Sequence, residues 1–347
     1  MRATSPRFAN RHWFRLSPLS VLLAPAALLL SALVAVRRLL YRVGLFASVR
    51  LPVPVVVVGN IVAGGTGKTP LTIALARDLA ARGHRPGIVS RGFGAADSAP
   101  RAVLPTDGAR DAGDEPLLLA RRSGAPVYIG RDRVAAARAL LAAHPGCDVI
   151  LLDDGLQHYR SARDVELCVQ DDRGLGNRLP IPAGPLREPA SRTVDALVLN
   201  LPPGAVPGPV TAAARQSRMQ IRPGAIRLVC DRSVILPPAQ VAGPGLHAVA
   251  GIGNPGRFFA TLHTLGLEFE EHVFNDHQDY EDAQLRFPGA RLVLMTEKDA
   301  VKCEDFGRDD LAYLEVDAEL DPALPQWLDD RLAQLRGAAG PDTPAPS

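Results

Sequence analysis

The sequence predicts an α/β protein: a domain built on a parallel sheet, a second, smaller α/β domain, and an N-terminal membrane helix. Three observations support this prediction. An uncharged apolar segment stands near the start of the chain, short β-branched runs then alternate with helical stretches, and a Pro- and Gly-rich stretch separates two such series. A chain of 347 residues is long enough to form two domains.

The composition narrows the class of protein. With a net charge of +2 and 5% aromatic residues, the chain lacks the basic, aromatic-rich surface that binds nucleic acid, so we expect no nucleic-acid partner. Its four cysteines stand singly with no CxxC pair, which is typical of a reducing cytoplasm. Among 39 basic residues the only lysines are Lys68, Lys298 and Lys302, so each lysine indicates a role that arginine does not fill.

Residues 1–50 are predicted to form a membrane anchor. Residues 16–36 carry no charge, are long enough to cross a bilayer core of roughly 30 Å, and have arginines on both sides. These arginines suit anionic lipids, but they do not decide between a crossing helix and an in-plane helix. A cleaved signal peptide and a buried core helix are the alternatives. We expect an inner-membrane protein with its active site on the cytoplasmic face.

Two series of strands and helices follow the anchor. In residues 51–225 the pattern predicts strands at 53–58, 85–89, 127–129, 149–152, 165–169 and 196–199, with helices at 68–82 and 131–143. After a loop at 201–210, residues 226–336 are predicted to contain strands at 247–250, 268–273, 291–295 and 313–316 and a helix at 256–265. Residues 337–347 have too few apolar side chains to pack, so they are predicted to be a disordered tail.

The stretch AGGTGKTP at residues 63–70 is the strongest functional motif. It joins the first predicted strand to the first predicted helix, which directs backbone N–H groups and a helix N-terminus at a phosphate. Val62 stands where the full pattern has its first glycine, and a chance glycine-rich turn is the alternative. We nevertheless predict a P-loop NTPase-like domain. Its nucleotide-binding residues would be Gly64, Gly65, Thr66, Gly67, Lys68 and Thr69, with Lys68 on the β- and γ-phosphates and Thr69 on Mg²⁺.

Two carboxylates follow the strand at 149–152. Asp153 and Asp154 stand where P-loop proteins place the carboxylate that holds Mg²⁺ or its water shell, although they could instead cap the next turn. Gln157 and His158 come shortly afterwards in a polar loop that we expect to lie near the phosphates.

Two neighbouring classes of nucleotide-binding protein fit less well. Lys298 directly precedes Asp299, which is the wrong spacing for the guanine-reading motif of GTPases. Ala63 stands where the partitioning ATPases have a second lysine. A membrane-tethered regulatory P-loop ATPase that acts through a protein partner remains the alternative to an enzyme.

Eight motifs in order along the chain resemble tetraacyldisaccharide 4′-kinase, the lipid A kinase family of Gram-negative bacteria. They are VGNIVAGGTGKTP (58–70), SRGFG (90–94), AGDEP (112–116), LDDGLQH (152–158), PAGPLREP (182–189), GIGNPGRFF (251–259), the pair Asp276–His277, and TEKDAVK (296–302). The N-terminal apolar segment is similar to the family's membrane helix. Phe93 stands where a tyrosine is commoner in the family.

The resemblance implies an activity. The γ-phosphate of ATP, with Mg²⁺, would pass to the 4′-hydroxyl of tetraacyldisaccharide 1-phosphate, giving the tetraacyl 1,4′-bisphosphate precursor of lipid A. The acceptor would be a membrane-embedded glycolipid among inner-membrane lipids, and no obligate protein partner is implied. Two α/β/α domains joined by a short β linker would hold the active site in the cleft between them.

The resemblance also implies residue roles. Asp114 would act as the catalytic base with His277 of the second domain as its partner. From the residues alone, Asp114 would have been interpreted as a helix N-cap and His277 as a surface histidine. Candidate substrate contacts are Ser90, Arg91, Glu115, Gln157, His158 and Arg187, and an ion pair with Glu188 is the alternative role for Arg187. Lys298 and Lys302 lie in a family motif, but no physical role follows for them.

Overall fold

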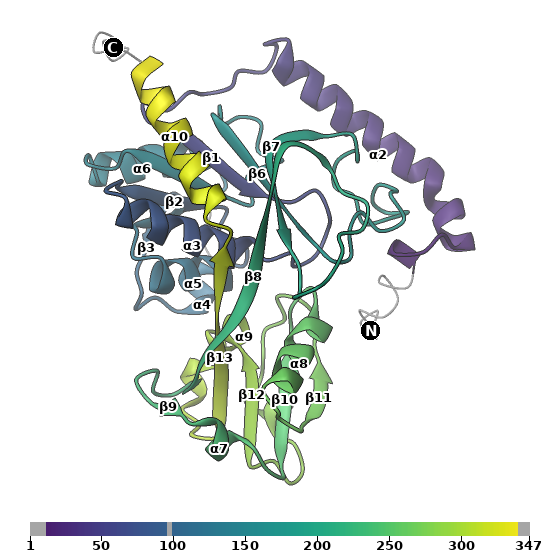
Figure 1. Ribbon diagram of the computed structural model, residues 1–347, viewed down its shortest axis with the longest axis vertical. Helices are drawn as coiled ribbons and strands as arrows, with labels where there is room; N and C mark the ends of the chain where they lie inside the picture. Colours follow the sequence, from purple (N-terminus) through teal and green to yellow (C-terminus); the bar gives the residue numbers. More distant parts are fainter. Residues whose placement is uncertain (1–11, 96–98, 339–347) are drawn as a thin grey trace.

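The computed structural model describes residues 12–95 and 99–338, and one continuous sheet runs through both of its lobes (Figure 1). The strand order is β11-β10-β12-β13-β8-β7-β6-β1-β5-β2-β4-β3, with β9 paired to β8. The predicted disordered tail lies outside the described residues from 339 onward, while residues 337 and 338 belong to the last helix. The α/β class and the large parallel sheet are therefore as predicted.

The first lobe contains the predicted parallel sheet. Its strands are β1 (Val55–Gly59), β2 (Pro86–Ser90), β4 (Val127–Ile129), β5 (Val149–Asp153), β6 (Val165–Asp171) and β7 (Thr193–Asn200), with the short β3 (Arg101–Val103) antiparallel at the edge. The valines of β1 are all buried, as expected of a parallel strand that is covered on both faces. The site residues follow the carboxyl ends of these strands.

Helices cover both faces of this sheet. Side chains of α3 (Lys68–Ala81) and α5 (Asp114–Arg122) pack into one apolar core, and those of α6 (Arg133–Ala143) pack into the other. A single turn, α4 (Ala109–Ala112), precedes α5. The helices α3 and α5 also contact each other on this face.

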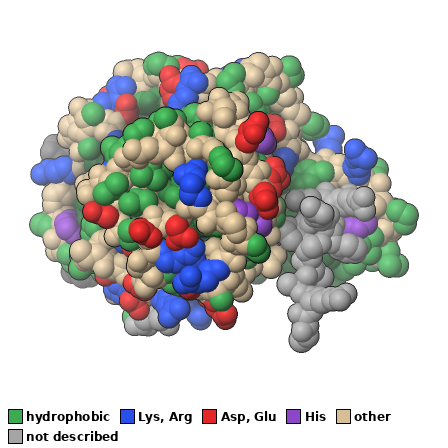
Figure 2. Space-filling model, turned by 90° about the horizontal axis from the view of Figure 1, so that it is seen from below, with side chains coloured by type: hydrophobic (Ala, Val, Ile, Leu, Met, Phe, Trp, Pro, Cys, Tyr) green, Lys and Arg blue, Asp and Glu red, His purple; other side chains and the backbone are tan. Residues whose placement is uncertain are grey.

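The second lobe is a smaller parallel sheet. It is formed by β10 (Leu246–Ala250), β11 (Glu270–Val273) and β12 (Leu292–Thr296). Helix α8 (Pro255–Thr264) packs on one face, while α9 (Glu297–Ala300) and the 3₁₀ turns η1 (Asp282–Leu285) and η2 (Glu304–Phe306) lie by the other. Short elements β9 (Ile235–Leu236) and α7 (Pro238–Val241) lie at the far end, where acidic, basic and apolar side chains are interspersed on the surface (Figure 2).

A long antiparallel ribbon joins the lobes. It consists of β8 (Ala212–Leu228) and β13 (Leu311–Leu320), and the domain boundary expected between residues 225 and 226 lies inside β8. After β13 the chain returns to the first lobe as α10 (Ala323–Ala338), so the prediction that residues up to 336 belong to the second domain is wrong for this helix. Leu324, Leu328 and Leu332 repeat at a four-residue spacing, so one face of α10 packs into the first core.

The N-terminal apolar segment forms α2 (Pro18–Arg42), which stands away from the sheet (Figure 1). Among the described residues, α2 is the one helix that is long enough and apolar enough to cross a membrane. Only 11% of the most apolar 18-residue stretch of α2 is buried, so the alternative of a buried core helix is wrong. One stripe of α2, including Ala27, Ser31 and Val34, faces the protein, while the remaining apolar side chains are exposed.

We expect Leu328→Ala to lower the free energy of unfolding by about 2–5 kcal/mol, because it leaves a cavity between α10 and the first lobe. Thermal unfolding of the detergent-solubilised protein, followed by circular dichroism, measures the change. Gln334→Ala on the exposed face of the same helix is the control and should change stability by less than about 0.5 kcal/mol. Equal melting temperatures for Leu328→Ala and the control would contradict the packing of α10.

Candidate active site

The loop at residues 63–67 has the backbone conformation that a phosphate-binding loop needs. Gly64 and Gly67 both have φ of 98°, in the left-handed region, and α3 begins directly after Gly67. Two amides hold the loop: Asn60 Nδ2 donates to the Thr66 hydroxyl at 3.1 Å, and Asn200 Nδ2 donates to the Thr66 carbonyl at 2.9 Å. A side chain at position 67 would collide with Asn200, so only glycine fits there.

Val62, the departure from the full motif, has a structural role. It is buried and forms an antiparallel β-bridge with Leu186, while the N–H of the following residue donates to the Pro185 carbonyl at 2.8 Å. The loop is therefore anchored to the segment that carries Arg187.

Asp153 and Asp154 follow one another at the end of β5 but have different surroundings. Asp153 is buried and accepts hydrogen bonds from Thr72 Oγ1 at 3.2 Å and from Ser90 Oγ at 3.4 Å. Burial, together with the nearby carboxylates of Glu115 and Asp154, raises the pKa of Asp153 to about 7. This group is therefore short of positive charge.

Asp154 has cationic neighbours. Its carboxylate lies 3.5 Å from Lys68 Nζ and 3.2 Å from Arg187 Nη1. Burial opposes ionisation, but Lys68 and Arg187 outweigh it and lower the pKa of Asp154. The alternative that Arg187 pairs with Glu188 is wrong, because Glu188 is buried and pairs instead with Arg192 at 2.8 Å.

Asp114 and His277 meet across the cleft. His277 Nδ1 lies 3.0 Å from Asp114 Oδ2 and 3.2 Å from Oδ1, although the residues are 163 positions apart. Helix α5 begins at Asp114 with Gly113 as its N-cap, so the interpretation of Asp114 as an N-cap is wrong. His277 has φ of 58°, a strained conformation for a residue with a side chain, and its ring packs 4.7 Å from that of Phe93.

The two partners shift each other's pKa in opposite directions. Burial favours neutral Asp114, yet the hydrogen bond from His277 and the charge of Lys298 outweigh burial and lower the pKa of Asp114. For His277 burial again opposes the charge, and the hydrogen bond to Asp114 raises its pKa. An ionised carboxylate beside an imidazole can hold or exchange a proton at this point of the cleft.

Lys298 lies at the centre of these groups, a position that the sequence did not predict. Its Nζ is 2.9 Å from Glu115 Oε1, 3.1 Å from Asp276 Oδ1 and 3.3 Å from His277 Nε2. Despite burial, these carboxylates raise its pKa above the usual range, so the ammonium stays charged. The scarcity of lysine and the motif TEKDAVK at residues 296–302 marked it in the sequence, but neither indicated these contacts. Lys302 instead binds Asp299 at 2.9 Å and supports the neighbouring loops.

A cavity of about 670 Å³ brings the predicted site residues together. It reaches from α2 to the P-loop and across to His277, whereas Asp114 is buried next to His277. Predicted residues in its wall are Gly64, Gly65, Lys68, Ser90, Arg91, Glu115, Asp154, Gln157, His158, Arg187 and His277. Arg37, Arg131 and Arg133 also line it, and the sequence offered no signal for them because arginine is common throughout the chain.

Two side chains that were predicted to contact the substrate, those of Gln157 and His158, have other features that bear on this role. Gln157 Nε2 donates to the Asn60 carbonyl and to Glu188 Oε1, both at 3.0 Å, so this side chain also positions the loop. Burial and neighbouring arginines lower the pKa of His158 to about 4, so it lines the cavity as a neutral imidazole.

A second cavity of about 190 Å³ lies on the other side of the P-loop, between the lobes. Thr66, Gly67 and Thr69 form its polar side, and Ile252 and Phe258 of the second lobe contribute apolar side chains. Arg173 links the two lobes next to this cavity, because its guanidinium donates to the Gly65 carbonyl at 2.7 Å and to the Gly253 carbonyl at 3.1 Å.

The P-loop and His277 both line the larger cavity, and the apolar helix α2 forms part of its wall. This combination is that of a P-loop phosphotransferase. The comparisons with known proteins agree. A family model described as tetraacyldisaccharide-1-P 4′-kinase matches residues 19–333. The chain belongs to this family, and the predicted resemblance is confirmed.

Individual relatives cover nearly the whole chain. Tetraacyldisaccharide 4′-kinase of Janthinobacterium sp. (strain Marseille) is 47% identical over 95% of this chain and 97% of the relative, and that of Alkalilimnicola ehrlichii is 50% identical over 90% and 92%. The crystal structure of "apo" form LpxK from Aquifex aeolicus in complex with ATP has a TM-score of 0.75 and 28% identity, covering 90% of this chain and 99% of that one. The lipid A kinase function is thus confirmed over that of a regulatory ATPase.

We expect Lys298→Met to destabilise the protein by about 3 kcal/mol at pH 8, because it leaves carboxylates of both lobes without their shared cation. Without the ammonium, the pKa of the buried Asp114 carboxyl should rise in the folded state, because burial raises it and Lys298 is one of the charges that lower it. The lost stability should therefore be partly regained as the pH falls towards 5. Thermal unfolding between pH 5 and 8 measures both effects.

Arg222→Met is the matched control for this substitution. The Arg222–Glu319 ion pair is largely exposed, with side chains 55% and 60% accessible, so its loss should cost no more than about 1 kcal/mol at any pH. A loss in Lys298→Met that stays constant from pH 5 to 8 would point to packing and would contradict the electrostatic role.

Proposed function

We propose that this kinase binds ATP with its phosphates on the loop at residues 63–69 and transfers the γ-phosphate to the 4′-hydroxyl of tetraacyldisaccharide 1-phosphate. The observation that carries this proposal is a single cavity that is lined by Lys68, His277 and residues of α2. Donor phosphate and acceptor hydroxyl can meet there. Positioning of this kind supplies much of the catalysis in phosphoryl transfer.

The Asp114–His277 pair is proposed to accept the proton of the acceptor hydroxyl. A sugar hydroxyl is a poor nucleophile at neutral pH, so a base within reach aids its attack. His277 lines the cavity and the buried Asp114 lies behind it, so the two act as one unit. Lys298 is proposed to be a positioning residue that keeps the Asp114 carboxylate ionised.

The nucleotide is proposed to lie across the P-loop with its base in the smaller cavity. Apolar side chains of Ile221, Ile252 and Phe258 suit a flat heterocycle, and the polar rim of Thr66 and Thr69 leads to the phosphates. The sequence had left the base-binding residues unidentified.

Mg²⁺ is proposed as the metal cofactor, with Thr69, Asp153 and Asp154 as its ligands or the partners of its water shell. The donor set fits, since hydroxyl and carboxylate oxygens suit this ion, and burial followed by the charges of Glu115 and Asp154 raises the pKa of Asp153, so a nearby cation would favour its ionised form. When bound, the ion would neutralise charge on the phosphates.

The disaccharide is proposed to occupy the larger cavity with its acyl chains along α2. The five arginines of the wall, Arg37, Arg91, Arg131, Arg133 and Arg187, suit the acceptor's phosphate and the charge of the transferred group. Exposed Leu29, Leu33 and Val36 would be covered by lipid. We propose location in the inner membrane with the cleft on the cytoplasmic face, where ATP is available.

The first experiment is mass spectrometry of tetraacyldisaccharide 1-phosphate after incubation with ATP, Mg²⁺ and the detergent-purified protein. We expect the lipid to gain one phosphate with wild type. Lys68→Ala, Asp114→Asn and His277→Ala should each lower the rate at least 100-fold, since each removes a group that acts on the reacting atoms or the base.

Asp111→Asn is the matched control, because Asp111 is exposed and lies only three residues from Asp114. It should retain wild-type activity. Consumption of ATP without any change in the lipid would contradict the proposed acceptor. Full activity in Asp114→Asn and His277→Ala would contradict the assignment of the catalytic base but not the kinase activity.

A second prediction concerns α2. The double variant Leu29→Glu, Leu33→Glu places charges on its exposed face, at a cost of about 2.5–3.5 kcal/mol each at the centre of a membrane. We expect it to detach from phospholipid vesicles in a flotation assay, while ATP binding is retained because neither side chain lines the cavity.

The control is the double variant Leu29→Ala, Leu33→Ala, which shortens the same side chains without adding charge and should float with the vesicles. If the glutamate variant also floats with the vesicles, lipid does not cover this face of α2.

A further inference from the structure

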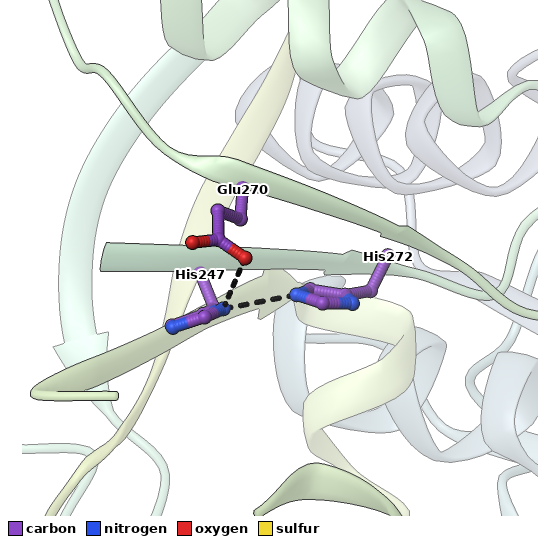
Figure 3. Close-up of side chains that lie close together, drawn as sticks. All are labelled: His247, Glu270 and His272. Atoms are coloured by element: carbon purple, nitrogen blue, oxygen red, sulfur yellow. Dashed lines mark hydrogen bonds and ion pairs between the residues drawn. The ribbon is translucent and has the colours of Figure 1, made fainter. Parts of the chain in front are cut away.

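A cluster of three side chains stands apart from the cleft, at the outer edge of the second lobe. Figure 3 shows His247, Glu270 and His272 pointing towards one another from neighbouring strands. Among the described residues their ligand atoms form a group in which all lie within 4.8 Å of one another. None of the three lines either cavity, and the proposed phosphoryl transfer does not use them.

The pairing of two strands places the cluster on one face of the sheet. β10 and β11 are parallel, and His247 is paired with Glu270 in their register. Since side chains alternate along a strand, Glu270 and His272 of β11 point to the same side. β11 is the last strand of the sheet, and the Glu270 side chain is 76% exposed whereas that of His247 is buried, so the cluster can be reached from solvent on one side.

The distances are close to those of a metal site. His247 Nδ1 lies 2.9 Å from His272 Nε2 and 3.7 Å from Glu270 Oε2. Tetrahedral ligands at about 2.0–2.1 Å from a zinc ion lie about 3.3 Å apart. Opening the nitrogen–nitrogen contact by about 0.4 Å, the difference between 3.3 and 2.9 Å, would admit the ion.

The two imidazole rings are held in place by Phe287. Its ring centroid lies 5.0 Å from that of His247 and 3.7 Å from that of His272, with interplanar angles of 14° and 15°. The nitrogen–nitrogen hydrogen bond requires at least one ring to present an unprotonated nitrogen, which is the form that binds a metal. The ligands are thus partly ordered before an ion arrives.

We propose that His247, Glu270 and His272 bind a divalent transition-metal ion, Zn²⁺ in the first instance, with a fourth position open to water. Two imidazoles and one carboxylate suit Zn²⁺ or Co²⁺, whereas Mg²⁺ and Ca²⁺ prefer sites made of oxygen. The proposal does not depend on the proposed function, because it concerns a different part of the molecule from the Asp153–Asp154 pair.

Such an ion would act on structure. It would join the edge strand β11 to β10 through side chains, in addition to the backbone ladder. β11 ends at Val273, and the loop that follows carries Asp276 and His277. Binding at His272 would therefore steady the strand from which the proposed catalytic loop departs.

The test is a metal titration of the full-length protein purified without a histidine tag, treated with EDTA and kept in detergent with excess Mg²⁺ to occupy oxygen-rich sites. We expect one Zn²⁺ per chain by calorimetry, and one Co²⁺ whose visible absorption is that of a tetrahedral complex. Glu270→Gln and His272→Gln should each weaken binding at least tenfold.

His263→Gln is the matched control. His263 lies in α8 of the same lobe and stacks on Phe269, but it is exposed and outside the cluster, so this variant should bind as wild type does. Glu270→Gln alone decides the matter if His272→Gln fails to fold, because the Glu270 side chain is exposed. Absence of binding by wild type, or equal binding by wild type and Glu270→Gln, overturns the proposal.

Discussion

The site depends on the ion pairs of the Lys298 ammonium group, which lies where the two lobes meet. It bonds to Glu115 of the first lobe and to Asp276 of the second, and it lies 3.9 Å from the Asp114 carboxylate. A buried cation is costly unless carboxylates surround it, and buried carboxylates are costly without a cation. Each lobe therefore supplies what the other lacks, and this mutual requirement brings Asp114 to His277.

The ribbon of β8 and β13 determines how the lobes can be arranged. Both strands belong to both lobes, so the lobes share a sheet, which a flexible linker would not provide. A register shift between Leu314 and Val316 bends the ribbon where these two residues line the smaller cavity. Arg173 joins the P-loop to the Gly253 loop next to the same cavity. The ribbon and Arg173 thus both fix the walls of the cleft.

Local patterns in the sequence predicted much of the first lobe. The valines of β1 and the glycines before Lys68 carry their signal within a dozen residues, because parallel strands are continuously apolar and phosphate loops need glycine. The strand β8 was not predicted, because arginine, glutamine and serine interrupt its apolar residues and only Ser217, Met219 and Ile226 are buried. Asp114 and His277 are 163 positions apart, and Lys298 and Glu115 are 183 apart, so no local pattern could indicate these contacts. The family resemblance supplied the first pair and left the lysine without a role.

With α2 in the proposed membrane location, the wall that it contributes to the larger cavity would make substrate capture a two-dimensional problem. Leu30, Ser31 and Val34 belong both to the cavity and to the helix whose other side is exposed and apolar. A glycolipid diffusing within the bilayer would enter sideways, with its chains never leaving the hydrocarbon. Extraction into water would cost about 0.8 kcal/mol for each methylene group, a sum that no binding site recovers for four acyl chains. Turnover would then follow the surface density of the lipid, and its bulk concentration would matter little.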